Sequence, residues 1–340
     1  MIMNSKYFFI LTLFALGGCS SSSETEKYQY KRDNIIYVKK EIKEIDLKDI
    51  LISNSVKLYT INEYLLMSDN KTLDKLIYLF DKNNYDYITS ILDRGQGPLE
   101  ITSVGFVGIN DNENMIYITD HGKQKILGYD LDSIQTNPLY VPTEKMILNN
   151  TQFPFAYQYI NDTLSMGIMI EPTGNSGYDH SVAKINFNTA EIKTMKYKHP
   201  EIEKKRIRFA VSMEHGIYVE CYAYHDLMTI CDIDGNLLYN VYGKKWNNKT
   251  TNEYSFYNKA IFCHDKILVS FSDGKDRYSN TERDYPTQFI VFSAKGDYIK
   301  TLETEYAIMD FCYDKDNNRI ILHLDEDIQF AYLELDGIMQ

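Results

Sequence analysis

The sequence predicts an all-β fold in which six four-stranded antiparallel blades form a ring, and three observations lead to this prediction. Apolar, strand-like runs that end in a polar residue and a turn recur six times, about 51 residues apart on average. Two more short strands precede each run, separated in the clearest repeats by clusters of Asn, Asp and Gly. No stretch carries the 3.6-residue apolar period of a long helix. Four-stranded units repeated around an axis make a six-bladed β-propeller. The six runs end at Asp81, Asp130, Asn186, Asp232, Ser293 and Glu334.

The composition agrees with a large folded β-structure. Hydrophobic residues form 44% of the 340-residue chain and aromatic residues 14%, which is ample for a packed core. Acidic residues outnumber basic ones by 48 to 36, giving a net charge of −12, so we expect no nucleic-acid partner. A β-sandwich remains a minor alternative, but it does not explain a four-strand pattern that recurs at this spacing.

The first residues carry the features of a bacterial secretion signal. Lys6 precedes a short apolar run, Tyr7 to Leu16, which is about half the length that a membrane-spanning helix needs. The sequence Leu16-Gly17-Gly18-Cys19 resembles the lipobox of bacterial lipoproteins. The resemblance implies that residues 1–18 are a signal peptide and that Cys19 is lipidated, which would anchor the protein to a membrane. A free cysteine after an ordinary signal is the alternative.

The residues after Cys19 predict a tether and a location. Residues 19–33 begin with four serines and acidic residues, and we expect them to form a flexible tether. The Ser-rich, acidic stretch also resembles the export signal of Bacteroidetes surface lipoproteins. We therefore expect an outer-membrane lipoprotein that faces either the periplasm or the cell surface. Residues 34–340 are expected to form the propeller.

The last repeat suggests how the ring closes. It shows only three strands before the chain stops at Gln340, which would leave an unpaired sheet edge. The β-rich run from Asn34 to Asp46 precedes the first blade and is the natural donor of the missing strand. We therefore expect closure by an N-terminal strand.

Two motifs resemble a known family. Met115 to Asp120, followed by Tyr129-Asp130, resembles an NHL-type blade, and Arg94 to Glu100 resembles the Gly-x-Gly-Pro-x-Glu signature of Bacteroidetes six-bladed propeller lipoproteins, which are TolB-like or NHL-like. The resemblance covers essentially the whole chain after the signal. It implies the fold and leaves the chemistry open.

Loop length predicts which face of the ring binds a ligand. In a propeller blade, the connections after the second and fourth strands share one face. The stretches Glu171 to Ser181 and Ser272 to Gln288 are expected to be long loops on that face, and long loops often carry function. The expected ligand-binding residues there are Arg94, Glu100, Trp246, Arg277 and Tyr278.

Known catalytic and metal motifs do not appear in the sequence. The stretch Gly95 to Pro98 is not a phosphate loop, because a strand-like run rather than a helix follows it. The histidines form no zinc-type pair, so we assign neither catalytic residues nor a metal site. The four later cysteines lie in apolar runs, and no obligate disulfide is expected. They are Cys221, Cys231, Cys263 and Cys312.

Two functional hypotheses remain. The leading one is a non-catalytic, lipid-anchored binding module of the cell envelope, whose long-loop face binds a glycan, a peptide or a protein. The alternative is a calcium-dependent hydrolase or lyase similar to propeller lactonases, whose central site would gather oxygen ligands from several inner strands. No other cofactor is expected.

Overall fold

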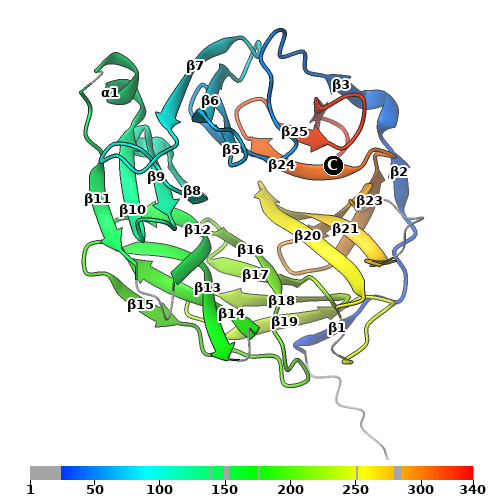
Figure 1. Cartoon of the computed structure of the whole chain (residues 1–340). Helices are drawn as coiled ribbons and strands as arrows, with labels where there is room; N and C mark the ends of the chain where they lie inside the picture. Colours follow the sequence, from blue (N-terminus) through cyan, green and yellow to red (C-terminus); the bar gives the residue numbers. More distant parts are fainter. Residues whose placement is uncertain are drawn as a thin grey trace, which may run out of the picture.

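The computed structural model describes residues 24–137, 139–148, 153–174, 177–249, 252–278 and 285–339. Within these ranges the chain forms six sheets that surround a common axis, and Figure 1 looks along that axis. In each sheet the strands from β4 onward run outward from the axis in chain order, and in the last three sheets an N-terminal strand is added at the outer edge. The predicted six-bladed β-propeller is confirmed. The expected signal peptide and the lipidated Cys19 lie outside the described residues.

The first three blades contain four antiparallel strands each. Blade 1 is β4 (Val56–Ile61), β5 (Tyr64–Asp69), β6 (Lys75–Asp81) and β7 (Tyr87–Asp93). Blade 2 is β8 (Val104–Asn110), β9 (Met115–Asp120), β10 (Lys125–Asp130) and β11 (Thr143–Ile147); the short helices η2 (Asp111–Glu113) and α1 (Leu131–Thr136) follow β8 and β10. Blade 3 is β12 (Phe153–Asn161), β13 (Leu164–Gly174), β14 (Gly177–Asn186) and β15 (Glu191–Thr194).

The last three blades each include a strand from the N-terminal segment. Blade 4 is β16 (Ile207–Ser212), β17 (Ile217–Tyr222), β18 (Leu227–Asp232), β19 (Leu237–Tyr242) and β1 (Glu26–Tyr28). Blade 5 is β20 (Tyr254–Cys263), β21 (Lys266–Asp276), β22 (Gln288–Ser293), β23 (Tyr298–Glu303) and β2 (Ile35–Tyr37). Blade 6 is β24 (Ile308–Asp314), β25 (Arg319–Leu324), β26 (Phe330–Glu334) and β3 (Ile42–Glu44), which the short helix η1 (Lys39–Glu41) precedes.

The second strand of a blade shows why the sequence reads as continuous apolar runs. Every residue of β5, β17 and β25 is buried, because neighbouring blades cover both faces of the sheet. A strand that is buried on both faces needs apolar residues at successive positions rather than at alternate ones. The turn after the third strand uses Gly235 and Gly296 in blades 4 and 5, where φ is +86° and +80°. These left-handed conformations favour glycine.

One predicted loop is in fact an extended hairpin, and a second begins later than predicted. β13 and β14 stay paired as far as Gly174 and Gly177, so most of the stretch Glu171 to Ser181 is strand. β20 and β21 pair as far as Tyr254 and Asp276, so the predicted fifth-blade loop begins only after Asp276. The prediction was wrong because an antiparallel hairpin satisfies its own backbone hydrogen bonds and does not need apolar side chains to do so.

The N-terminal strap, residues 24–46, runs along the outer edge of blades 4, 5 and 6. β1 pairs parallel with β19, and β2 pairs parallel with β23. β3 pairs antiparallel with β26 and supplies the outer strand that blade 6 lacks, so the predicted closure is confirmed. Residues 26–33 were expected to belong to the flexible tether. Instead β1 pairs with blade 4, because the free edge of β19 offers it backbone hydrogen-bond partners.

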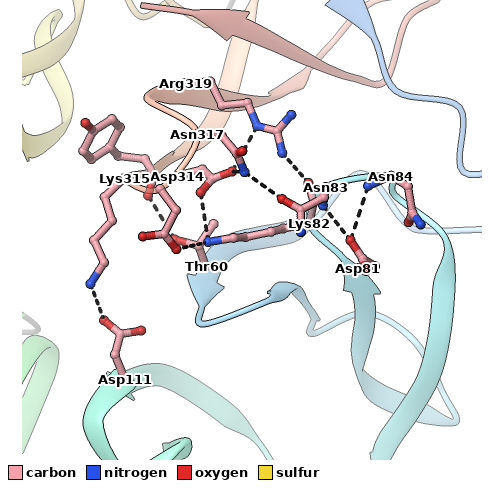
Figure 2. Close-up of polar contacts among 12 residues, drawn as sticks. Thr60, Asp81, Lys82, Asn83, Asn84, Asp111, Asp314, Lys315, Asn317 and Arg319 are labelled. Atoms are coloured by element: carbon pink, nitrogen blue, oxygen red, sulfur yellow. Dashed lines mark hydrogen bonds and ion pairs between the residues drawn. The ribbon is translucent and has the colours of Figure 1, made fainter.

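A buried polar cluster joins blade 6, the last blade, to blade 1 (Figure 2). Lys82, in the turn between β6 and β7, lies with its Nζ 3.0 Å from the Asp314 carboxylate, at the end of β24. Arg319 Nε donates to the other oxygen of Asp314 at 3.0 Å, and its Nη2 donates to the carbonyl of Lys82. Asn317 also donates to Asp314. These contacts connect the turn after β6 in blade 1 with β24 and β25 in blade 6, so the cluster helps to close the ring.

Candidate functional site

Two arginine–tyrosine pairs lie on the face of the ring that carries the turns after β5, β9, β13, β17, β21 and β25. In each pair an arginine lies over a tyrosine ring. Arg206, just before β16, lies over the ring of Tyr178 on β14, with 3.8 Å between the guanidinium carbon and the ring centroid. Arg206 also donates to the carbonyl of Lys205 at 2.9 Å. Tyr178 is 41% exposed. A guanidinium stacked in this way keeps donors free for a ligand.

The second pair lies between blades 4 and 5. Arg277, which follows β21, lies 5.1 Å from the ring centroid of Tyr224, in the turn between β17 and β18. Its Nη1 donates to the Tyr224 hydroxyl at 3.2 Å and to the Asn252 carbonyl at 3.0 Å. We call Tyr178, Arg206, Tyr224 and Arg277 the arginine–tyrosine rim.

Arg208 links the two pairs. It is the second residue of β16, two positions after Arg206, and therefore points to the same side of the strand. Burial lowers the pKa of the Arg208 guanidinium; Tyr224 and Tyr178 oppose this shift, and Arg277 adds to it. Within the described part of the chain the Arg208 side chain has no hydrogen bond or ion pair. It is thus a half-buried cation without a counterion.

The positive charges of the nearby arginines also lower the pKa of His180. Burial lowers the pKa of His180 to about 4, and the charges of Arg206 and Arg208 contribute to that shift. Its Nδ1 accepts a hydrogen bond from the Ile207 amide at 3.2 Å. The His180 ring lies between two exposed rings, with centroid distances of 5.5 Å to Tyr178 and 5.7 Å to Phe155. His180 is therefore neutral at pH 7 and completes an aromatic shelf beside the arginines.

Further positive charge lies at the axis. Lys57 on β4 and Lys259 on β20 belong to the innermost strands of blades 1 and 5. They share one carboxylate, Asp310 on β24, whose Oδ1 lies 2.8 Å from Lys259 Nζ and 3.9 Å from Lys57 Nζ. The Lys57 and Lys259 side chains are 54% and 32% exposed, so solvent reaches them at the axis. The Asp310 side chain is 3% exposed.

Lys57 and Arg208 are each the second residue of an innermost strand, Lys57 on β4 in blade 1 and Arg208 on β16 in blade 4. The pKa of Lys57 lies below its ordinary value. Asp310 acts to raise that pKa, but burial and two positive neighbours, Lys259 and Arg208, outweigh its effect. The charge of Arg208 on blade 4 thus contributes to the lowered pKa of Lys57 on blade 1. We call Lys57, Arg208 and Lys259 the axial cation cluster.

Of the predicted ligand-binding residues, Arg277 and Tyr278 lie on this face, at the end of β21. Arg277 belongs to the rim, and Tyr278 is 66% exposed. Trp246 is instead half-buried beside the outer strand β19, where its ring lies 4.9 Å from Tyr242 and 5.5 Å from His199. Trp246 is therefore a packing residue at the periphery of blade 4.

Arg94 and Glu100 occupy a self-contained turn between blades 1 and 2. Arg94 donates to the carbonyl of Asn70, and the Glu100 carboxylate accepts a hydrogen bond from the Gly97 amide at 2.7 Å. A Cβ at Gly95 would lie 1.9 Å from that carboxylate, which explains the glycine. The turn contributes no residue to the rim.

The sequence analysis missed Lys57, Tyr178, Arg206, Arg208, Tyr224 and Lys259 as site residues. They are spread over blades 1, 3, 4 and 5, so no continuous motif marks them. A local signal lies in Arg206-x-Arg208, in which the first arginine directly precedes the inner strand β16 and the second belongs to it.

The described residues contain neither a metal-binding group of side chains nor an exposed thiol. No group of three His, Cys, Asp or Glu side chains gathers there in a metal-binding arrangement. The four described cysteines are buried free thiols. Burial raises the pKa of Cys263. No helix within the described residues is long and apolar enough to cross a membrane.

Comparison with known proteins places the chain among propellers. The model of the 6-bladed beta-propeller family DUF5128 matches residues 41–267, more than half of the chain. The protein belongs to this family. No curated protein sequence matches the chain. The DUF5128 propeller is thus defined by its fold, and its function must be argued from its site.

Solved structures show the same fold at low sequence identity. A protein from Bacteroides fragilis, described as exported, is 11% identical with a TM-score of 0.54, covering 91% of this chain and 98% of that one. A DUF4221 family member from Bacteroides vulgatus is 12% identical with a TM-score of 0.56, covering 86% and 94%. A luciferin-regenerating enzyme is 7% identical with a TM-score of 0.53, covering 86% and 94%. At these identities the likeness concerns the fold alone.

Proposed function

We propose that this DUF5128 propeller is a lipid-anchored binding module of the cell envelope. The signal-like residues 1–18 and the lipobox-like Leu16 to Cys19 support attachment to the outer membrane through Cys19, with the propeller facing the periplasm or the cell surface. The similar Bacteroides fragilis protein, described as exported, supports the same compartment.

The arginine–tyrosine rim, together with Arg208 between its two pairs, supports an acidic ligand. The chain carries a net charge of −12, yet Arg206, Arg208 and Arg277 meet on one face, where only Asp179, 3.5 Å from Arg206, is an ion-pair partner among the described residues. A concentration of one sign of charge attracts a ligand of the opposite sign. The unpartnered Arg208 between the two stacked pairs is the observation that carries the proposal.

The exposed rings beside the arginines favour a glycan among acidic ligands. Tyr178 and Phe155 are 41% and 42% exposed and present flat apolar surface that the C–H face of a sugar ring can cover. Aromatic and arginine side chains are also the residue types that dominate binding energy at interfaces. We therefore propose a non-catalytic module for an acidic glycan.

Polygalacturonate, a simple acidic glycan, provides the test by isothermal titration calorimetry. We expect it to bind the wild-type protein, to bind more weakly at high salt, and to bind Arg206→Ala and Arg277→Ala about tenfold more weakly, the cost of a moderate hot spot. Arg94→Ala is the matched control, an arginine on the same face but outside the rim, and should bind as the wild type does. Neutral dextran should not bind.

Three outcomes would contradict the proposal. Binding of dextran as tight as that of polygalacturonate would show that charge is not recognised. Binding of poly-L-glutamate without binding of polygalacturonate would move the ligand from glycans to acidic peptides. Equal loss of affinity in Arg94→Ala and Arg277→Ala would show that the rim is not the site.

A further inference from the structure

We propose that the axial cation cluster binds a doubly charged anionic group, such as a phosphate, a sulfate or a pair of carboxylates. The inference rests on the proposed function, because it names the part of an acidic ligand that would reach beyond the rim to the axis. It concerns Lys57, Arg208 and Lys259 rather than the rim residues.

The charge balance at the axis supports a divalent ligand. Lys57 and Lys259 share a single carboxylate, that of Asp310, and Arg208 has no ion-pair partner among the described residues, so the three cations outnumber their carboxylate partners by two. One Asp310 oxygen lies 2.8 Å from Lys259 Nζ, and the other accepts a hydrogen bond from the Leu58 amide at 2.8 Å. Asp310 is therefore already engaged, and it lies 3.9 Å from Lys57.

Three buried cations elsewhere in the protein each contact a carboxylate, whereas Arg208 contacts none among the described residues. Arg32 lies 2.8 Å from the Asp226 carboxylate, Lys82 lies 3.0 Å from that of Asp314, and Lys205 lies 2.5 Å from that of Glu220. Burying a charge without a partner costs free energy. The excess of cations at the axis therefore lacks the compensation found elsewhere in the fold, and an anionic ligand would supply it.

The donors at the axis suit oxyanions. Arg208 offers a planar fork of N–H donors, and the two lysines offer ammonium groups on flexible stems. Together they can approach an anion from blades 1, 4 and 5, which are the blades that carry them. Phosphate and sulfate groups present several oxygens in different directions, and so does a pair of carboxylates, so the shared chemistry is a divalent oxyanion.

Titration calorimetry with small anions tests this site without knowledge of the natural ligand. The probes are inorganic phosphate, sulfate and succinate at constant ionic strength, with chloride as the monovalent control. We expect at least one of the three divalent anions to bind in the millimolar range or tighter and chloride not to compete. Which of them binds most tightly distinguishes a phosphate or sulfate ester from a dicarboxylate as the source.

Two substitutions make the test specific. Arg208→Met and Lys57→Met should each weaken binding of the divalent anion at least tenfold, whereas the exposed Lys40→Met should leave it unchanged. Without anion, Arg208→Met should melt no lower than the wild type, because it removes a cation that lacks a partner. A lower melting temperature would show that Arg208 is a structural residue and would overturn the proposal.

The outcomes also separate this inference from the proposed function. If none of the divalent anions binds, or if they bind Arg208→Met as tightly as the wild type, the axial site is wrong, while loss of polygalacturonate binding in Arg277→Ala would still support the rim. If the anions bind at the axis but polygalacturonate does not bind, the proposed glycan function is wrong and the axial site stands.

Discussion

Arg32 fastens the N-terminal strap to the ring, and its replacement should weaken the whole fold. Its Nη1 lies 2.8 Å from the Asp226 carboxylate, and the two side chains are 5% and 0% exposed. Its Nη2 donates to the Tyr257 hydroxyl at 3.2 Å. The guanidinium also lies 5.4 Å from the ring centroids of Phe271 and Phe292. The strap thus inserts a buried cation between blades 4 and 5.

The substitution Arg32→Met keeps apolar packing against the two phenylalanines and removes the charge. Removing one partner of a buried ion pair costs about 3 to 5 kcal/mol, because the other charge stays buried. We take the lower end, about 3 kcal/mol, since Asp226 still accepts a hydrogen bond from Tyr257 at 3.0 Å. For a chain of this length about 1 kcal/mol lowers the melting temperature by about 2 °C, so we expect a drop of about 6 °C.

Calorimetric melting gives the comparison, with Lys39→Met as the control on the same strap. The Lys39 and Glu305 side chains form an ion pair but are 46% and 48% exposed, so its loss should cost at most about 1 kcal/mol. The double variant Arg32→Met/Asp226→Asn should be less destabilised than the sum of the single changes. Equal melting temperatures for Arg32→Met and Lys39→Met would refute the docking of the strap.

Four further predictions concern the anchor, ring closure, pH and calcium. Cys19→Ala should release the protein from the membrane fraction after a high-salt wash, whereas continued sedimentation with the outer membrane would contradict the lipid anchor. Deleting residues 34–46 should lower the melting temperature more than deleting residues 24–28, because only the first deletion removes β3 and opens blade 6; equal effects would refute the closure. Burial lowers the pKa of His323 to about 4 from an ordinary 6.5, so the unfolded chain binds the extra proton, and stability present above pH 6.5 is lost as the pH falls to about 4. Urea unfolding at pH 7 and pH 4 should show about 3 kcal/mol less loss in His323→Gln than in the wild type, and parallel losses would contradict the assignment. Calcium and a chelator should give the same melting temperature, since cations cluster at the axis; a rise of several degrees with calcium would favour the calcium-dependent enzyme.

The repeat pattern could be predicted closely because each blade buries its middle strands on both faces. The six residues that end the predicted runs are the last residues of the third strands: Asp81, Asp130, Asn186, Asp232, Ser293 and Glu334. The missing outer strand of blade 6 followed from the same logic, since an open sheet edge must be paired. Apolar patterning and the pairing of sheet edges therefore made the fold predictable from the sequence.

Segments that do not depend on apolar burial were predicted less well. The end of the β13–β14 hairpin is polar, so Glu171 and Asp179 suggested a loop although they pair across the two strands. β1 lies in a polar stretch and is held by the backbone of β19 and by Arg32, neither of which leaves a periodic signal. Backbone pairing with a distant edge cannot be read from the sequence of one strand.

The candidate site was only partly predictable. Loop positions placed Arg277 and Tyr278 on the face that carries the proposed site, but the other two arginines of that site lie on β16 and just before it. Trp246 was selected for its residue type, yet it packs against Tyr242 away from the axis. A site assembled from single residues on several blades appears only when the ring brings those residues together.

A crystal structure of the wild-type protein with trigalacturonate is the most direct test of the proposed binding site. We expect the sugar rings to lie on Tyr178 and Phe155 and a carboxylate to lie about 3 Å from the Arg208 guanidinium, a charge-assisted hydrogen-bond distance. A ligand bound on the opposite face, beside Lys82 and Asp314, or at the Arg94 turn, with the rim free, would contradict the proposed site.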